Sequence, residues 1–434
     1  METHTKRELK KLVHIAKFEN IIKKLNEFLQ GGPPDKESIR AGIYLPITKE
    51  GKTILEVIPV NRIKEIPYIW EEAFFPEKFT LRPFGDSVYH IAAKRGFLDQ
   101  CPNPTPAALT CTNKLQSTPL DYAANSGTLT QIPKALLLEL LPENISAIHQ
   151  AALRKQLDQV PNELFTESLV EAIHDSRTLV QTAAEGGSLL QLPPKFVTTK
   201  SLIEIRRNDN SALHIAAESG TLDQVPQEFI TKVNLATYDT SGQTVAQVAA
   251  ANGHLSQITL KLAQELMFVY MEQPCMTVSM SGAVTRGNDP EPDFKSNLLH
   301  CAAAKGKLDK VPAELFTEKA MTEQNASGHT VLHIAACKEC FDQIPPKYIT
   351  NTALLTSCHN AAEATIEEIL GIGDKGTVLE CIHANQLGCL MHVELSEECK
   401  DYVSKDWWDS YKSIQKRKAN LEEKEEQANE IDIF

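Results

Sequence analysis

The sequence lacks any long apolar segment. No uninterrupted hydrophobic run approaches the roughly 18 residues that a membrane-spanning helix needs, so we expect no membrane association. Residues 1–20 are charged throughout and lack the apolar core and small-residue cleavage site of a secretory signal. Together these two features predict a cytoplasmic protein.

Cysteine and positive charge are also scarce. The chain has 10 cysteines among 434 residues, which is too few for a disulfide framework, and we expect reduced thiols. Its formal net charge is −13, which argues against a protein that coats the phosphate backbone of a nucleic acid. Direct binding to nucleic acid is therefore not expected, and a protein partner is favoured.

Catalytic signatures are missing as well. No Ser/His/Asp arrangement, phosphate loop or H-E-x-x-H motif occurs. Residues 371–376 match G-x-G-x-x-G, but residues 361–370 before them resemble a helix, whereas a dinucleotide site requires a strand there. We interpret these glycines as a turn. The sequence therefore predicts neither an enzyme nor a bound cofactor.

What the chain does contain is one segment repeated many times. Ser211–Ile230 has a front half with a small-residue helix, ending at Gly220, and a back half that turns the chain at Pro226. Its Ala-Ala pair recurs at residues 92–93, 123–124, 151–152, 183–184, 216–217, 249–250, 302–303 and 335–336. A segment this short cannot bury an apolar face alone, so its copies are expected to stack.

The back half of each copy carries a second landmark, Leu-x-Gln/Lys-aliphatic-Pro or a close variant. We call Ser211–Ile230 the organising copy. In it, Pro226 is expected as the first residue of a short helix, Gln227–Ile230, because proline suits that position. One copy has Thr259 in place of the proline and runs into an apolar stretch, Ile258–Met271. We expect an unusually long helix there.

A unit of about 33 residues with a turn followed by Leu-His-x-Ala-Ala-x-x-Gly resembles the ankyrin repeat. Residues 117–124 and 328–336 carry the resemblance best. It implies an all-α, ankyrin-like α-solenoid of about eight to ten repeats with helical caps at both ends. The proline departs from the family pattern, in which a long second helix follows. What the resemblance implies about function is binding of other macromolecules, mostly proteins, and that inference rests on fold analogy.

Three domains follow from this pattern. Residues 1–48 are expected to form an N-terminal helical cap, residues 49–395 the repeat solenoid, and residues 396–434 a C-terminal helix with an acidic tail. The array contains an insertion at about residues 273–295, which is a candidate contact loop. We expect the protein to be a monomer.

Histidines occur in the repeats at one fixed position, two residues before the Ala-Ala pair. Other copies have Asp121, Gln181 or Gln247 there, and all of these side chains can form hydrogen bonds. We therefore interpret the position as structural, binding one copy to the turn of its neighbour. The histidines concerned are His90, His149, His214, His300 and His333.

The leading hypothesis is a non-enzymatic scaffold for protein–protein interaction. Its partner is expected on the repeat turns and the concave helix face, where residues just after each Ala-Ala pair differ between copies. Acids and bases alternate along this series, which favours a specific protein partner. The candidate residues are Lys94, Arg95, Asn125, Ser126, Arg154, Lys155, Glu218, Ser219, Asn252 and Lys305.

Two alternatives remain open. The last five residues, with Ile431, Ile433 and Phe434, resemble the Q-L-x-L-F peptides that dock on bacterial sliding clamps, with Glu430 replacing Gln. They would make the chain an adaptor or inhibitor of a nucleic-acid enzyme or replication factor, although an ordinary acidic terminus is the simpler interpretation. The second alternative is a metal-binding or enzymatic C-terminal third, in which zinc would be bound by Cys337, Cys340, Cys381 and Cys389.

Overall fold

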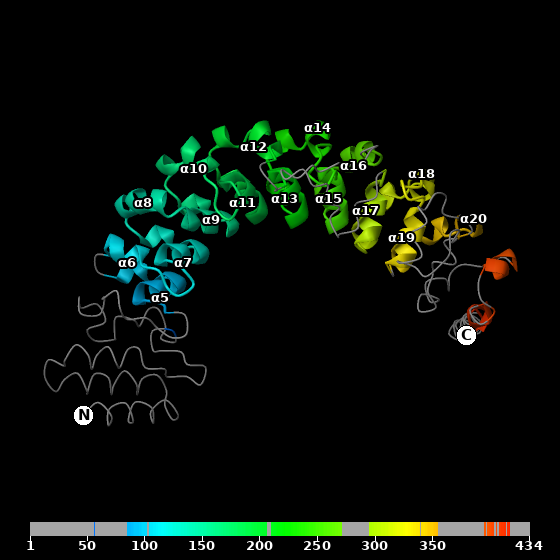
Figure 1. The fold of residues 1–434 in the computed structure, drawn as a ribbon, viewed down its shortest axis with the longest axis horizontal. Helices are drawn as coiled ribbons and strands as arrows, with labels where there is room; N and C mark the ends of the chain where they lie inside the picture. Colours follow the sequence, from blue (N-terminus) through cyan, green and yellow to red (C-terminus); the bar gives the residue numbers. More distant parts are fainter. Residues whose placement is uncertain are drawn as a thin grey trace, which may run out of the picture. The chain divides into compact units, whose positions relative to one another are not determined.

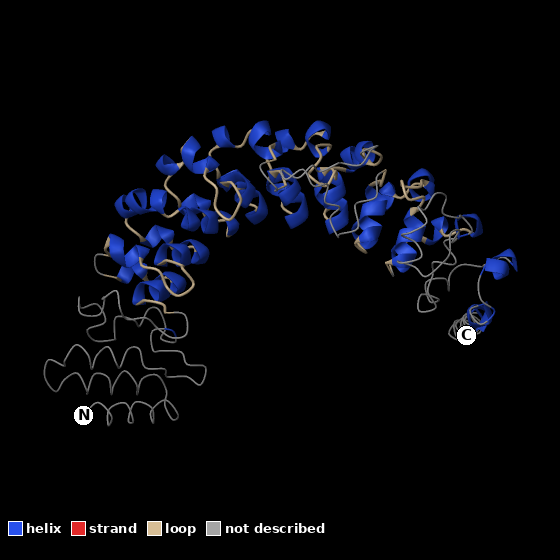
Figure 2. Cartoon of the chain, in the orientation of Figure 1, coloured by secondary structure: helices blue, strands red, loops and turns tan. Residues whose placement is uncertain are grey.

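The computed structural model describes residues 56, 85–101, 104–205, 210–270, 295–338, 340–354, 395, 397–402, 405, 408–413, 415 and 416. Within these ranges every regular element is a helix and no strand occurs (Figure 2). The predicted all-α class is therefore confirmed for this part of the chain. None of its helices is long and apolar enough to cross a membrane.

The organising copy folds as four short elements. Helix α13 (Ala212–Ser219) begins at Ser211, whose side chain accepts a hydrogen bond from the His214 amide, and it ends at Gly220 with φ 72°. Only a residue without Cβ adopts this left-handed backbone without strain. The following elements are the 3₁₀ helices η10 (Leu222–Gln224) and η11 (Gln227–Phe229) and the helix α14 (Lys232–Leu235).

The expected helix Gln227–Ile230 was wrong in detail. Pro226 precedes η11 as its N-cap, with φ −53° and ψ 132°, and Ile230 lies beyond its end. The segment forms only one 3₁₀ turn, and α14 follows at once. Thr231 is the N-cap of α14, and its side chain accepts a hydrogen bond from the Asn234 amide. The sequence did not predict η10 or α14 as separate elements.

The chain divides into two compact units, Met1–Thr198 and Thr199–Phe434. We name them the N-terminal unit and the C-terminal unit. The division falls inside the stretch expected to be a single array. The predicted domain boundaries themselves lie largely outside the described residues, as do the cap at residues 1–48 and the insertion, apart from Lys295.

In the N-terminal unit, the helices that carry the Ala-Ala pairs pack against one another in chain order. Their paired alanines are 0% exposed. These small side chains allow the backbones of adjacent helices to pack closely. These inner helices are α5 (Val88–Arg95), α7 (Pro119–Ser126), α9 (Ile145–Leu153) and α11 (Leu179–Gly186) (Figure 1).

A second row of helices in this unit lies alongside the row of inner helices (Figure 1). It consists of α6 (Pro106–Thr110), α8 (Lys134–Leu140) and α10 (Glu167–Glu171). The 3₁₀ helices that connect the rows are η3 (Leu98–Gln100), η4 (Leu129–Gln131), η5 (Leu141–Glu143), η6 (Leu157–Gln159), η7 (Asn162–Leu164), η8 (Leu189–Gln191) and η9 (Pro194–Phe196).

The C-terminal unit repeats this arrangement. Its inner helices are α13, α15 (Val245–Asn252), α17 (Leu298–Ala304) and α19 (Val331–Cys337), again packed in chain order. The second row consists of α12 (Thr199–Ile203), α14, α16 (Leu260–Leu266), α18 (Glu318–Thr322) and α20 (Asn351–Leu354). The remaining 3₁₀ helices are η12 (Leu255–Gln257), η13 (Leu308–Lys310), η14 (Ala313–Leu315), η15 (Phe341–Gln343), η16 (Pro346–Tyr348) and η18 (Glu397–Tyr402).

The long helix expected over Ile258–Met271 was wrong. Helix α16 has seven residues, beginning after Thr259, whose side chain accepts the Leu262 amide. Ile258 belongs instead to the turn after η12, where it is buried. Thr259 thus caps a helix at the position where the other copies have proline.

Part of the predicted C-terminal helix lies within the described residues. Trp408 and Tyr411 are buried, and the Leu395 amide donates a hydrogen bond to Tyr411 Oη at 2.9 Å.

Candidate interaction surface

The repeated histidines join adjacent inner helices. His90 Nδ1 accepts the Ser87 amide of its own N-cap at 3.0 Å, and its Nε2–H donates to Ser117 O of the next copy at 2.9 Å. His300 Nε2 reaches His329 O in the same way, at 3.1 Å. Burial lowers the pKa of His90, so the neutral ring that this geometry requires is favoured. For His90 and His300 the structural interpretation of this position is confirmed.

His214 forms the fullest of these joints. Its Nδ1 lies 2.7 Å from Ser211 Oγ, and its Nε2–H is shared between Thr237 O and Gln243 O, each at 3.1 Å. The turn that presents these carbonyls is held by Asp239, whose Oδ1 accepts the Ser241 and Gln243 amides at 2.8 Å. His214 is 0% exposed and both of its ring nitrogens are engaged, so it presents no nitrogen to solvent.

The other residue types at this position perform the same task. Gln247 Oε1 accepts the Thr244 amide at 2.8 Å, and its Nε2 donates to Ser296 O at 2.7 Å. Asp121 Oδ2 accepts the Thr118 amide at 2.7 Å, and its Oδ1 accepts from Ser146 Oγ at 2.6 Å. Each of these side chains caps its own helix and binds the next copy.

A second set of hydrogen bonds between neighbouring copies was not predicted from the sequence. The glutamine of the Leu-x-Gln landmark reaches back to the preceding copy. Gln131 Oε1 accepts the Leu98 amide at 2.9 Å and its Nε2 donates to Gly96 O at 3.0 Å. Gln191 binds the Leu157 amide and Lys155 O, each at 3.0 Å. The glutamine recurs in the sequence, but its partner lies more than thirty residues away.

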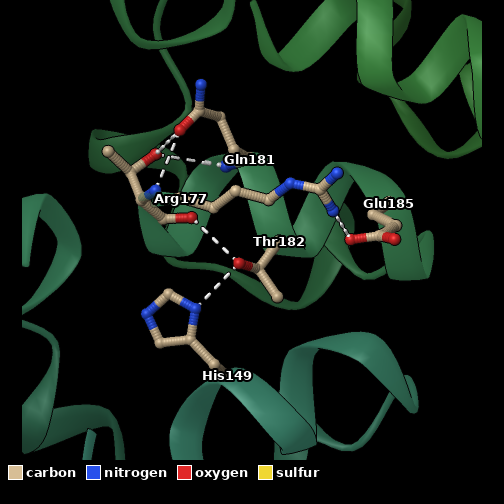
Figure 3. A network of polar contacts seen from close by, with 6 residues as sticks. His149, Arg177, Gln181, Thr182 and Glu185 are labelled. Carbon is tan, nitrogen blue, oxygen red and sulfur yellow. Dashed lines mark hydrogen bonds and ion pairs between the residues drawn. The ribbon is translucent and has the colours of Figure 1, made fainter. Parts of the chain in front are cut away.

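Helix α9 forms a joint of a different kind, shown in Figure 3. His149 Nδ1 lies 2.7 Å from Thr182 Oγ1, which itself donates to Thr178 O at 3.1 Å. His149 Nε2 is buried and has no hydrogen-bond partner. The ring centroid of His174 lies 5.2 Å away. Burial, reinforced by His174, lowers the pKa of His149 to about 4.

The C-terminal end of α9 is also exceptional. Lys155 has φ 58°, at the position where six of the other seven copies have a left-handed glycine and the copy with α19 has Glu339 in the sequence. A lysine Cβ in this conformation is sterically strained by about 1 kcal/mol. The glycines at this position are Gly96, Gly127, Gly187, Gly220, Gly253 and Gly306.

Helix α11 lies unusually close to this end of α9. A Cβ atom at Gly186 would lie 2.2 Å from Ala152 O and 2.6 Å from Leu153 Cα. Such distances do not occur between real atoms, so only glycine fits there. The next residue but one, Ser188, donates its hydroxyl to Ala152 O at 2.7 Å.

Most of the predicted partner-binding residues are accessible. Asn125 and Arg154 come together, because Arg154 Nε donates to Asn125 Oδ1 at 2.6 Å. Arg95 and Asn252 are only partly accessible, and Asn252 Nδ2 donates to Val248 O of its own helix. The exposed members are Lys94, Asn125, Ser126, Arg154, Lys155, Glu218, Ser219 and Lys305.

The predicted tail residues Ile431, Ile433 and Phe434 lie outside the described residues, as does the glycine motif at 371–376. So do Cys381 and Cys389. Cys340 is buried with its Sγ 3.5 Å from Ala303 O, and burial raises the pKa of its thiol to about 11. In the part of the chain that the structure describes, no three His, Cys, Asp or Glu residues are grouped to hold a metal ion.

Comparison with known proteins adds no assignment. No protein-family model matches the chain, and no curated protein sequence matches it either. The function must therefore be argued from the residues themselves.

Proposed function

We propose that this chain is an ankyrin-like helical solenoid of eight to ten repeats that acts as a non-enzymatic scaffold for protein–protein interaction. The partner binds the C-terminal ends of the inner helices. One observation carries the proposal: the paired alanines are fully buried in each described copy, whereas the exposed residues that follow them differ. Buried positions that are alike between copies, combined with exposed positions that differ, suit recognition of a particular partner.

The chemistry of the frame supports binding over catalysis. The histidines that could serve as bases use their nitrogens to cap a helix and to hold the next copy, as at His90 and His214. The thiol of Cys340 is buried with a raised pKa, which makes it a poor nucleophile. The exposed ends of the inner helices carry no such structural duty and are available to a partner.

The experiment is site-specific photo-crosslinking in the host cell. A crosslinking amino acid replaces Ser126, exposed at the end of α7, or Glu139, exposed on α8 in the second row. We expect a discrete protein adduct at position 126 and none at position 139. Adducts of equal yield at both positions, or none at position 126, would contradict the proposed function.

A further inference from the structure

The ends of three inner helices in the N-terminal unit form a cationic surface on an acidic protein. We name this surface the basic edge: Lys94 and Arg95 at the end of α5, Asn125 and Ser126 at the end of α7, and Arg154 and Lys155 after α9. Four of its six residues are positive and none is acidic, although the Glu56 carboxylate acts electrostatically on Arg95. The whole chain has a net charge of −13. At the next helix, Glu185 forms an ion pair with Arg177.

The helix dipole does not account for this surface. Cations are favoured at any helix C-terminus, yet α7 ends in Asn125 and Ser126, and α13 ends in Glu218 and Ser219. Lysines follow α17 (Lys305) and α19 (Lys338), so positive residues occur at some of these helix ends and not at others.

Two residues of the basic edge are held in fixed positions, and the backbone of one of them, Lys155, is strained. Lys155 adopts the left-handed backbone that six other copies give to glycine, and glycine there would be free of strain. Arg154 Nε donates to Asn125 Oδ1 at 2.6 Å, so its guanidinium reaches the end of α7, the neighbouring inner helix. A strained residue that persists is a reason to look for a function at that position.

We propose that the basic edge binds an extended acidic segment of a partner protein. Neighbouring helices pack 8–10 Å apart, so a path from α5 across α7 to α9 spans roughly 20 Å, about six residues of extended chain. Carboxylates at the ends of such a segment would meet Lys94 at one end and Arg154 and Lys155 at the other. Asn125 and Ser126 would bind its backbone in between.

A protein segment fits better than a nucleic acid. A patch of four cations offers few phosphate contacts, and the acidic remainder of the chain repels a long polyanion. The inference rests on the proposed function, because it specifies which kind of partner the scaffold surface takes.

Binding of a labelled peptide to the full chain tests the inference. The probe is a fluorescein-labelled Glu-Ser peptide of about eight residues, compared with its Gln-Ser counterpart by fluorescence anisotropy at low and high salt. The test variant combines Lys94→Gln with Arg154→Gln. The matched control combines Lys305→Gln with Lys338→Gln, two lysines exposed on the C-terminal unit. Thermal unfolding checks that both variants are folded.

We expect the Glu-Ser peptide to bind about tenfold more weakly to the test variant than to the control, with affinity falling as salt rises. The Gln-Ser peptide should not bind. Equal loss in both variants, no binding to the unaltered chain, or tighter binding of a single-stranded RNA of the same length would overturn the inference.

Failure here is distinguishable from failure of the proposed function. A crosslinked partner at position 126 whose binding does not depend on salt or on Arg154 would contradict only the acidic segment. The absence of any crosslinked partner there would contradict the scaffold itself.

Discussion

Helices α13 and α9 are the same repeated segment built in two ways. Helix α13 has a side-chain N-cap at Ser211, a histidine with both nitrogens engaged, and a left-handed glycine at its end. Helix α9 has no side-chain cap at Asn144, a histidine with one unpartnered nitrogen, and strained Lys155 in place of the glycine. Each difference makes the α9 copy less favourable for folding.

The comparison separates the frame of the protein from its surface. The α13 copy shows the arrangement that satisfies each local requirement of helix ends and buried polar groups. The α9 copy departs from it at Asn144, His149 and Lys155, and of these only Lys155 lies at the basic edge. Departures from local rules concentrate at functional sites.

The largest effect is expected at the contact between α11 and α9. Gly186→Ala should destabilise the N-terminal unit by about 3 kcal/mol, because its Cβ would overlap backbone atoms of Ala152 and Leu153. In an unconstrained helix the same change would stabilise by up to about 1 kcal/mol. Urea unfolding measures the difference. Ser219→Ala, at the equivalent position of α13, is the control and should be nearly neutral; a stabilised Gly186→Ala variant would contradict the contact.

The next effect concerns pH. The pKa of His149 is about 4 in the fold and near 6.5 when unfolded, so the unfolded chain binds a proton first as pH falls. The stabilisation is complete above pH 6.5 and is lost between pH 6.5 and 4, by up to about 3 kcal/mol. His149→Leu should flatten this part of the stability profile. A slope unchanged by the substitution would show that His149 binds a proton equally in the folded and unfolded chain, and would contradict the lowered pKa.

A paired substitution compares the two joints directly. His214→Leu should cost about 2 kcal/mol at pH 7, because Thr237 O, Gln243 O and Ser211 Oγ lose their partner. His149→Leu should cost less than about 1 kcal/mol, because it removes an unpartnered nitrogen while Thr182 Oγ1 keeps its bond to Thr178 O. Chemical denaturation at pH 7 gives both values, and equal costs would mean that the joints do not differ.

Local and periodic features could be predicted from the sequence. The all-α class and the helices carrying the Ala-Ala pairs follow from spacing and from glycine at the helix ends. The role of His214 follows from its exchange with Gln and Asp between copies. Each of these signals lies within a single copy or in a comparison between copies.

Features that depend on the distance between copies could not be predicted. The sequence does not indicate that Gln131 donates a hydrogen bond to Gly96 O, or that Gly186 packs against the backbone of α9. The length of a single turn does not distinguish a 3₁₀ helix from an α-helix after Pro226. Lys155 did leave a signal, since alignment of the copies places it among glycines, and its backbone conformation follows from that position.

The most direct test of the account is Lys155→Gly, measured for both stability and binding. The account predicts that the unfolding free energy rises by about 0.5–1 kcal/mol, because the left-handed strain is relieved, while affinity for the Glu-Ser peptide falls about threefold through loss of one charge. Lys94→Gln, which removes a charge without relieving strain, should weaken binding alone. A Lys155→Gly protein that is more stable and binds the peptide as tightly as the unaltered chain would contradict the claim that the strained lysine serves recognition.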